Sequence, residues 1–106
     1  MQTPPDAERW ATAPRERGVV LRLSVRNHPG VMSHVSGLFA RRAFNVEGIL
    51  CLPVGDGTRS AILLSVRADE RLEQLERQLA KLEDVLDIRE DPEGQRAFAM
   101  AAAFLG

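Results

Sequence analysis

The residues best suited to chemistry in this chain form a turn, Asn27-His28-Pro29-Gly30. Apolar residues alternate before this turn and recur at helical spacing after it, so we expect a strand to end there and a helix to begin. A helix that starts directly after a turn leaves several backbone N–H groups unpaired and pointing outward. Such a turn suits a small anion, for instance the carboxylate of an amino acid.

Side chains that could catalyse a reaction are few. His28 and His34 flank the start of the helix, but no Asp, Glu or Cys near them in the sequence gives the spacing of metal ligands. The chain has neither a G-x-S-x-G motif nor an acid pair. Cys51 lies in an apolar run without an evident base beside it. We therefore expect structural or surface roles for these residues, and neither a catalytic nor a metal site.

Hydrophobic periodicity predicts the elements around the turn. Val19 to Arg26 alternates apolar and polar residues, the pattern of a half-buried strand. Pro29 to Ala43 carries one apolar stripe and is predicted to be a helix. Phe44 to Val54 is rich in branched apolar residues and ends at the turn signal Gly55-Asp56-Gly57, so we expect a hairpin with a strand from Thr58 to Arg67.

A second helix is expected after Asp69, a credible N-cap, because leucines recur at helical spacing in Leu72, Leu75, Leu79 and Leu82. The stripe could be a coiled-coil seam, but its length of about two heptads favours a helix docked on a sheet. Val85 to Arg89 supplies a short fourth strand. The order β-α-β-β-α-β predicts a ferredoxin-like α+β fold, a four-stranded antiparallel sheet with two helices on one face.

This predicted domain spans residues 18–91. Residues 1–17 contain three of the six prolines and are expected to form a flexible arm. Residues 92–106 form an apolar, alanine-rich tail, for which we expect a short helix or an added strand.

Composition argues against several classes of function. Across 106 residues the net charge is -1 and aromatic residues make up 5 %. A near-neutral chain lacks the basic field that draws proteins onto nucleic acid or membranes, and RNA-recognition modules of this topology need strand aromatics. No run approaches the roughly 18 apolar residues of a membrane span, and the start does not resemble a signal peptide. With one cysteine, we expect a cytoplasmic protein that binds neither nucleic acid nor membrane.

Two helices cover only one side of such a sheet. Ile49, Cys51, Leu63 and Val85 are therefore expected on the uncovered side or at an edge, where apolar residues favour association. Side-by-side dimerisation into an eight-stranded sheet would bury such an edge. It would also place the Gly30 turn of one protomer near the second strand of the other.

The run VRNHPGVMSHVSGLFARRAFNVEGILCLP closely resembles the small regulatory subunit of acetohydroxyacid synthase (acetolactate synthase), isozyme I type, built on an ACT domain. RLEQL and KLEDV continue the resemblance, which covers residues 19 to 90. It implies a sensor without catalysis that pairs with a large subunit, raises its activity and transmits feedback inhibition by valine. Thiamine diphosphate, Mg and FAD are then expected in the large subunit only, with none in this chain.

The resemblance also implies the residues of an effector site. Asn27, Gly30 and Val31 of one protomer should hold the effector together with Asn45 and Val46 of its neighbour. Gly30 would allow close backbone approach, and the helix N-terminus would suit the carboxylate. Considered without the resemblance, Gly30 could serve only the turn and Asn27 could be only a turn or cap residue.

Two further points follow from the resemblance. Many relatives carry a second C-terminal domain that this sequence lacks, so the chain resembles the short class. The alternative from another class is a free-standing ACT module that binds amino acids without a catalytic partner.

Overall fold

The computed structural model describes residues 18–42, 46–67 and 70–106. The predicted arm, residues 1–17, lies outside the described residues, as do Asn45 and Asp69. The element order is β1 (Val19–Arg26), α2 (Val31–Arg42), β2 (Val46–Val54), β3 (Arg59–Val66), α3 (Leu72–Ala80), β4 (Val85–Glu90) and α4 (Gly94–Leu105).

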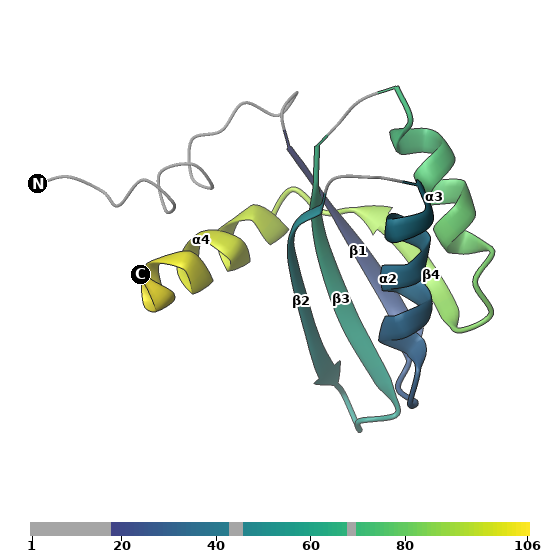
Figure 1. Ribbon diagram of the computed structural model, residues 1–106. Coiled ribbons are helices and arrows are strands. Elements are labelled where there is room, and N and C mark those ends of the chain that lie inside the picture. The colour runs from purple at the N-terminus through teal and green to yellow at the C-terminus, as the bar shows by residue number, and fades with distance from the viewer. Residues whose placement is uncertain (1–17, 43–45, 68–69) are drawn as a thin grey trace, which may run out of the picture.

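The four strands form one antiparallel sheet in the order β2-β3-β1-β4. Helices α2 and α3 lie together on one side of this sheet (Figure 1). The ferredoxin-like fold predicted from the sequence is therefore confirmed. In this order β1 is an interior strand, and β2 and β4 are the two edges.

The core lies between the sheet and the two helices α2 and α3. Alternation along β1 and β3 turns one row of each strand inward, where it meets the apolar stripes of the helices. The leucine stripe of α3 thus packs within this domain rather than forming a coiled-coil seam. The buried cluster consists of Leu21, Leu23, Val25, Val31, Val35, Leu38, Phe39, Ile62, Leu64, Val66, Leu75 and Leu79.

Two helix starts differ from the sequence expectation. Helix α2 begins at Val31 and not at Pro29, because Gly30 has a φ of 91°, which is incompatible with a right-handed helix. Helix α3 begins at Leu72, and its N-cap is Arg71, which makes no side-chain capping hydrogen bond. The observed N-cap thus differs from the expected Asp69, which lies outside the described residues. Leu72 is the first residue of the stripe that packs against the core, so burial sets the start of α3.

The apolar tail forms a third helix on the opposite side of the sheet. Val20 alternates with the inward row of β1, so its buried side chain points away from α2 and α3. A Cβ built on Gly94 at the start of α4 would lie 2.5 Å from Val20 Cγ1, and one built on Gly48 would lie 2.8 Å from Phe98 Cε1. Helix α4 therefore covers part of the face that the sequence reading left open, and its far end leads away from the sheet (Figure 1).

Most of the apolar residues expected at an edge or on the open face are found there. Ile49 and Cys51 lie on the edge strand β2 and are exposed. Their register partners belong to the core row of β3, so both residues point toward the α2 side. Leu63 points to the α4 side and is half-buried. Val85 lies on the other edge strand, where it packs against the core.

Among residues 18–42, 46–67 and 70–106, every helix is too short or too polar to cross a membrane.

Substitution of Gly94 by alanine tests how α4 is seated. The added methyl group would overlap the stiff, buried Val20 side chain, so we expect a loss of about 1–2 kcal/mol in the free energy of unfolding. Urea unfolding of the full chain measures this loss. Gly18→Ala is the matched control, because a Cβ at Gly18 meets no atom within 4 Å. Equal stability of the two variants would contradict this seating of α4.

Candidate functional site

The turn between β1 and α2 is open in front of its glycine. Gly30 is exposed and has a positive φ of 91°, a conformation that favours glycine. A Cβ built there would meet no atom within 4 Å. His34 N donates to Gly30 O over 3.1 Å, which closes the first turn of α2. Within the described part of the chain, the N–H groups of Gly30, Met32 and Ser33 donate to no protein acceptor. These donors suit a small anion at the helix N-terminus.

Asn27 fastens this turn to the turn between β2 and β3. Its side-chain Nδ2 donates to Gly57 O over 2.8 Å, and its backbone N donates to Thr58 O over 3.0 Å. Asp56 accepts from Thr58 N and Oγ1, and these hydrogen bonds lower the pKa of the Asp56 carboxyl group. Asn27 therefore has a structural role in the turn, as one sequence reading allowed. Contacts among the described residues leave its Oδ1 oxygen without a partner, as an acceptor for a ligand.

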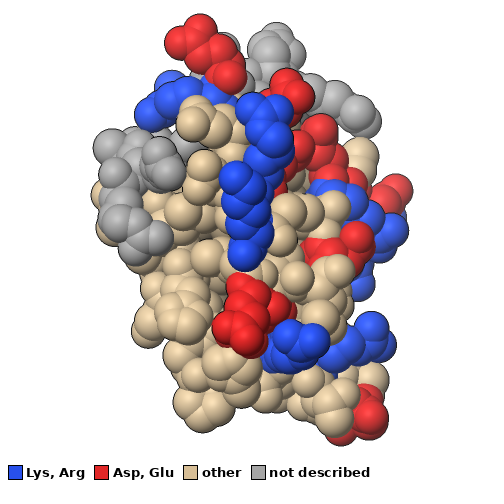
Figure 2. All heavy atoms as spheres, turned by 90° about the vertical axis from the view of Figure 1, so that its right-hand side faces the viewer, with Lys and Arg blue, Asp and Glu red and all other residues tan. Residues whose placement is uncertain are grey.

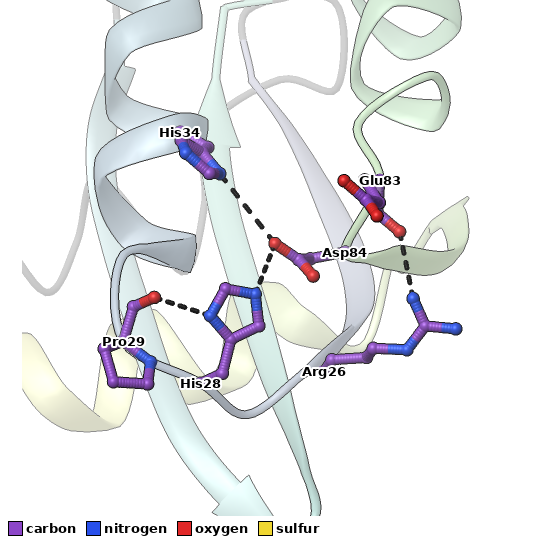
Figure 3. A network of polar contacts seen from close by, with 6 residues as sticks. All are labelled: Arg26, His28, Pro29, His34, Glu83 and Asp84. Carbon is purple, nitrogen blue, oxygen red and sulfur yellow. Dashed lines mark hydrogen bonds and ion pairs between the residues drawn. The ribbon is translucent and has the colours of Figure 1, made fainter.

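A third segment, the turn between α3 and β4, meets the same site (Figure 3). Asp84 O accepts from Arg26 N over 2.9 Å, and Asp84 Oδ2 lies 2.6 Å from His28 Nε2 and 3.8 Å from His34 Nδ1. The hydrogen bond with Asp84 raises the pKa of His28, and the Pro29 carbonyl raises it further. Sequence reasoning missed Asp84 because it looked for partners close to the histidines along the chain.

Despite this grouping, residues 18–42, 46–67 and 70–106 contain no cluster of three or more His, Cys, Asp or Glu side chains placed to hold a metal ion. The side chains of His28 and His34 are 42 % and 63 % exposed, and both face the largely buried Asp84 carboxylate. Only His28 is within hydrogen-bond distance of it, since His34 lies 3.8 Å away. The contacts of Asp84 with this turn, above all its hydrogen bond with His28, hold the β1–α2 turn against the α3–β4 turn.

The two halves of the effector site predicted from the sequence lie far apart within one chain. Val46 pairs with Val66, which pairs with Val19 at the start of β1. Asn27 follows the other end of β1. Eight strand residues, each about 3.3 Å long, therefore separate Asn27 from the end of the sheet where Val46 lies, a distance on the order of 25 Å. The structure therefore brings together Asn27, Gly30 and Val31 but not Val46, and Asn45 lies outside the described residues. A site that uses both halves needs two chains.

Charge on the helix side of the molecule is mixed. Figure 2 shows acidic and basic side chains interspersed there, with neither sign forming a continuous field. Glu76 on α3 is partly buried, and this burial, assisted by nearby Glu90 and Glu73, raises the pKa of its carboxyl group. Arg77 and Glu73 form an i,i+4 ion pair of 3.1 Å on the same helix.

Comparison with known proteins places this geometry in a family. Residues 21–87 match the family described as AHAS small subunit-like ACT domain. The chain is 57 % identical over 86 residues to the acetolactate synthase isozyme 1 small subunit of Escherichia coli (strain K12), covering 81 % of this chain and 90 % of that protein. It is 40 % identical over 76 residues to the isozyme 3 small subunit of the same strain, of which it spans 47 %.

Comparison with solved structures gives a consistent result. The acetolactate synthase small subunit from Thermotoga maritima superposes with a TM-score of 0.65 at 36 % identity, over 72 % of this chain and 48 % of that one. The ACT domain of GTP pyrophosphokinase from Chlorobium tepidum superposes with a TM-score of 0.59 at 17 % identity, over 71 % of this chain and 85 % of that domain, which shows the shared fold alone. The chain therefore belongs to the family of acetolactate synthase small-subunit ACT domains.

Proposed function

We propose that this chain is a non-catalytic regulatory subunit of acetolactate synthase, which activates a large thiamine-diphosphate-dependent subunit and confers feedback inhibition by valine in branched-chain amino acid biosynthesis. The observation that carries the proposal is 57 % identity to an isozyme 1 small subunit across 90 % of that relative. Thiamine diphosphate, Mg and FAD then belong to the large subunit, and the complex works in the cytoplasm.

The geometry of the β1–α2 turn supports the effector part of the proposal. The N–H groups of Gly30, Met32 and Ser33 offer donors for a carboxylate, at the positive end of α2. The Oδ1 oxygen of Asn27 is an acceptor for an ammonium group. An amino acid carries both groups. The side chain of Val31 is buried in the core, so this residue can offer the effector only its backbone.

The second half of the site comes from a partner protomer. Strand β2 is an edge strand that exposes Ile49, Cys51 and Leu52, with Leu52 at 65 % exposure. Unpaired edges with apolar side chains favour strand pairing with another chain. A two-fold, antiparallel β2–β2 pairing sets the start of β2 in one protomer beside the end of β2 in the other. Asn45 and Val46 then approach the β1–α2 turn of the partner, and the two sheets join into one sheet of eight strands.

The far end of α4 supports a contact with a further protein. Phe104 and Leu105 are 89 % and 81 % exposed, and Met100 is 72 % exposed. Large apolar side chains grouped on one projecting helix are typical of association surfaces. Helix α4 passes next to β2, where Phe98 lies close to Gly48, and its far end extends beyond the β2 edge (Figure 1), so this surface borders the edge that the dimer uses.

Gly30→Asp tests the effector site. The new side chain enters the space proposed for the carboxylate and adds a like charge, so we expect valine binding to fall at least tenfold, about 1.4 kcal/mol, in calorimetric titrations. Gly18→Asp is the control, because a Cβ at Gly18 also meets no atom within 4 Å and Gly18 precedes β1, at the opposite end of that strand from Gly30. Normal valine binding by Gly30→Asp would show that the effector binds elsewhere.

Reconstitution tests the partner. Added to the purified large catalytic subunit of acetolactate synthase from the same cell, the chain should raise acetolactate synthesis and make it sensitive to valine. Coupling of about 1–3 kcal/mol, roughly 5- to 150-fold in affinity, is ordinary for such a switch. A chain that binds valine but neither binds nor activates the large subunit would instead be a free-standing amino-acid-binding ACT module.

A further inference from the structure

His28 lies between two hydrogen-bond acceptors (Figure 3). Its Nδ1 atom is 2.5 Å from Pro29 O, and its Nε2 atom is 2.6 Å from Asp84 Oδ2. Neither a backbone carbonyl nor an ionised carboxylate has a proton to donate. Both ring nitrogens must therefore carry a proton for both contacts to be hydrogen bonds. The observed arrangement is that of the imidazolium form.

Charges from three elements surround this ring. The α3–β4 turn contributes the carboxylates of Asp84 and Glu83, α2 contributes His34, and β1 contributes Arg26. Arg26 NH1 donates to Glu83 O over 3.2 Å. The hydrogen bonds with Asp84 and with the Pro29 carbonyl raise the pKa of His28 above its usual value of 6.5, and the attraction of the two carboxylates for a positive ring raises it further.

The hydrogen bond to Pro29 O fixes the orientation of the next peptide group. The Pro29–Gly30 peptide bond is trans, so its carbonyl oxygen and the Gly30 N–H point in opposite directions. When His28 holds the carbonyl, the Gly30 N–H points away from the imidazole. Gly30 has open space in front of it, and its backbone can rotate more freely than that of any other residue. A neutral ring carries one N–H and can donate to only one of the two acceptors. Because the carboxylate is the stronger acceptor, the neutral ring keeps Asp84 and releases the Pro29 carbonyl, so the peptide group loses this restraint.

We propose that protonated His28, held by Asp84, is a positioning residue that orients the Gly30 N–H for the effector, so that effector binding is linked to proton binding at this ring. The inference rests on the proposed function, because it concerns the same turn. The restraint is complete below about pH 6.5 and is lost as the pH rises through the raised pKa of His28. The effector should therefore bind more tightly at mildly acidic than at alkaline pH.

NMR of the full chain without effector tests the restraint itself. The Gly30 amide resonance should move with the same midpoint as the His28 ring protons. Asp84→Asn, which removes the negative charge, should lower both midpoints together. A Gly30 amide that ignores the titration of His28 would overturn the proposal.

Calorimetric titration with valine between about pH 6 and pH 8 tests the link to binding. We expect the affinity of the unmodified chain to fall about two- to fivefold over this range, as an exposed ion pair would allow. His28→Gln should abolish this pH dependence. His34→Gln is the matched control and should keep it, because His34 does not contact Pro29 O.

The two tests separate this inference from the proposed function. A chain whose Gly30 amide follows His28 but which binds no valine at any pH supports the restraint and overturns valine as the effector. A chain that binds valine with the same pH profile after His28→Gln overturns the restraint and leaves the proposed function intact.

Discussion

Burial of the inward row of β1 is the constraint on which the rest of the structure depends. Leu21, Leu23 and Val25 are fully buried between the sheet and the helices α2 and α3. Because this row fixes which side of β1 faces the core and where the strand ends, it also fixes the position of the turn that follows. The candidate site begins at the residue after this strand.

Three turns that are distant in the sequence converge on that point. Asn27 links the β1–α2 turn to the hairpin turn through Gly57 and Thr58, and Asp84 links it to the α3–β4 turn. The contacts involve backbone carbonyls as well as side chains, so the loop is held largely by main-chain geometry. A site built in this way needs few functional side chains, and a small ligand would be bound mainly by backbone groups.

Much of the fold could be predicted from the sequence because its signals are local. Alternation identified β1 with its observed bounds, and the leucine spacing identified α3 as a helix packed on the sheet. The contact of Asp84 with His28 could not be predicted in this way, since periodicity carries no information on which turns meet in space. The start of α2 was misplaced because the conformation of Gly30 prevails over the helical preference of Pro29 at a first turn.

The candidate site was only partly accessible to sequence reasoning for a different reason. Asn27, Gly30 and Val31 are neighbours along the chain, and any model of the turn places them together. Val46 lies on the order of 25 Å away at the other end of the sheet, so its role depends on an association between chains. A single chain provides the exposed edge strand β2 and the N–H donors at the start of α2. The reason to combine these two features in one site comes from the family relationship.

The bond between Asn27 and the β2–β3 hairpin limits how this family member can vary in length. Hairpin tips are ordinarily places where insertions and deletions are tolerated. Here Gly57 O and Thr58 O are both acceptors for Asn27, so a residue gained or lost between Val54 and Thr58 would shift the register of these acceptors against the turn. An insertion within α3 would be no safer, because each added residue rotates Leu79 away from the core. A label is better attached to a substituted side chain on the exposed face of this helix, at Gln74, which needs no change in chain length.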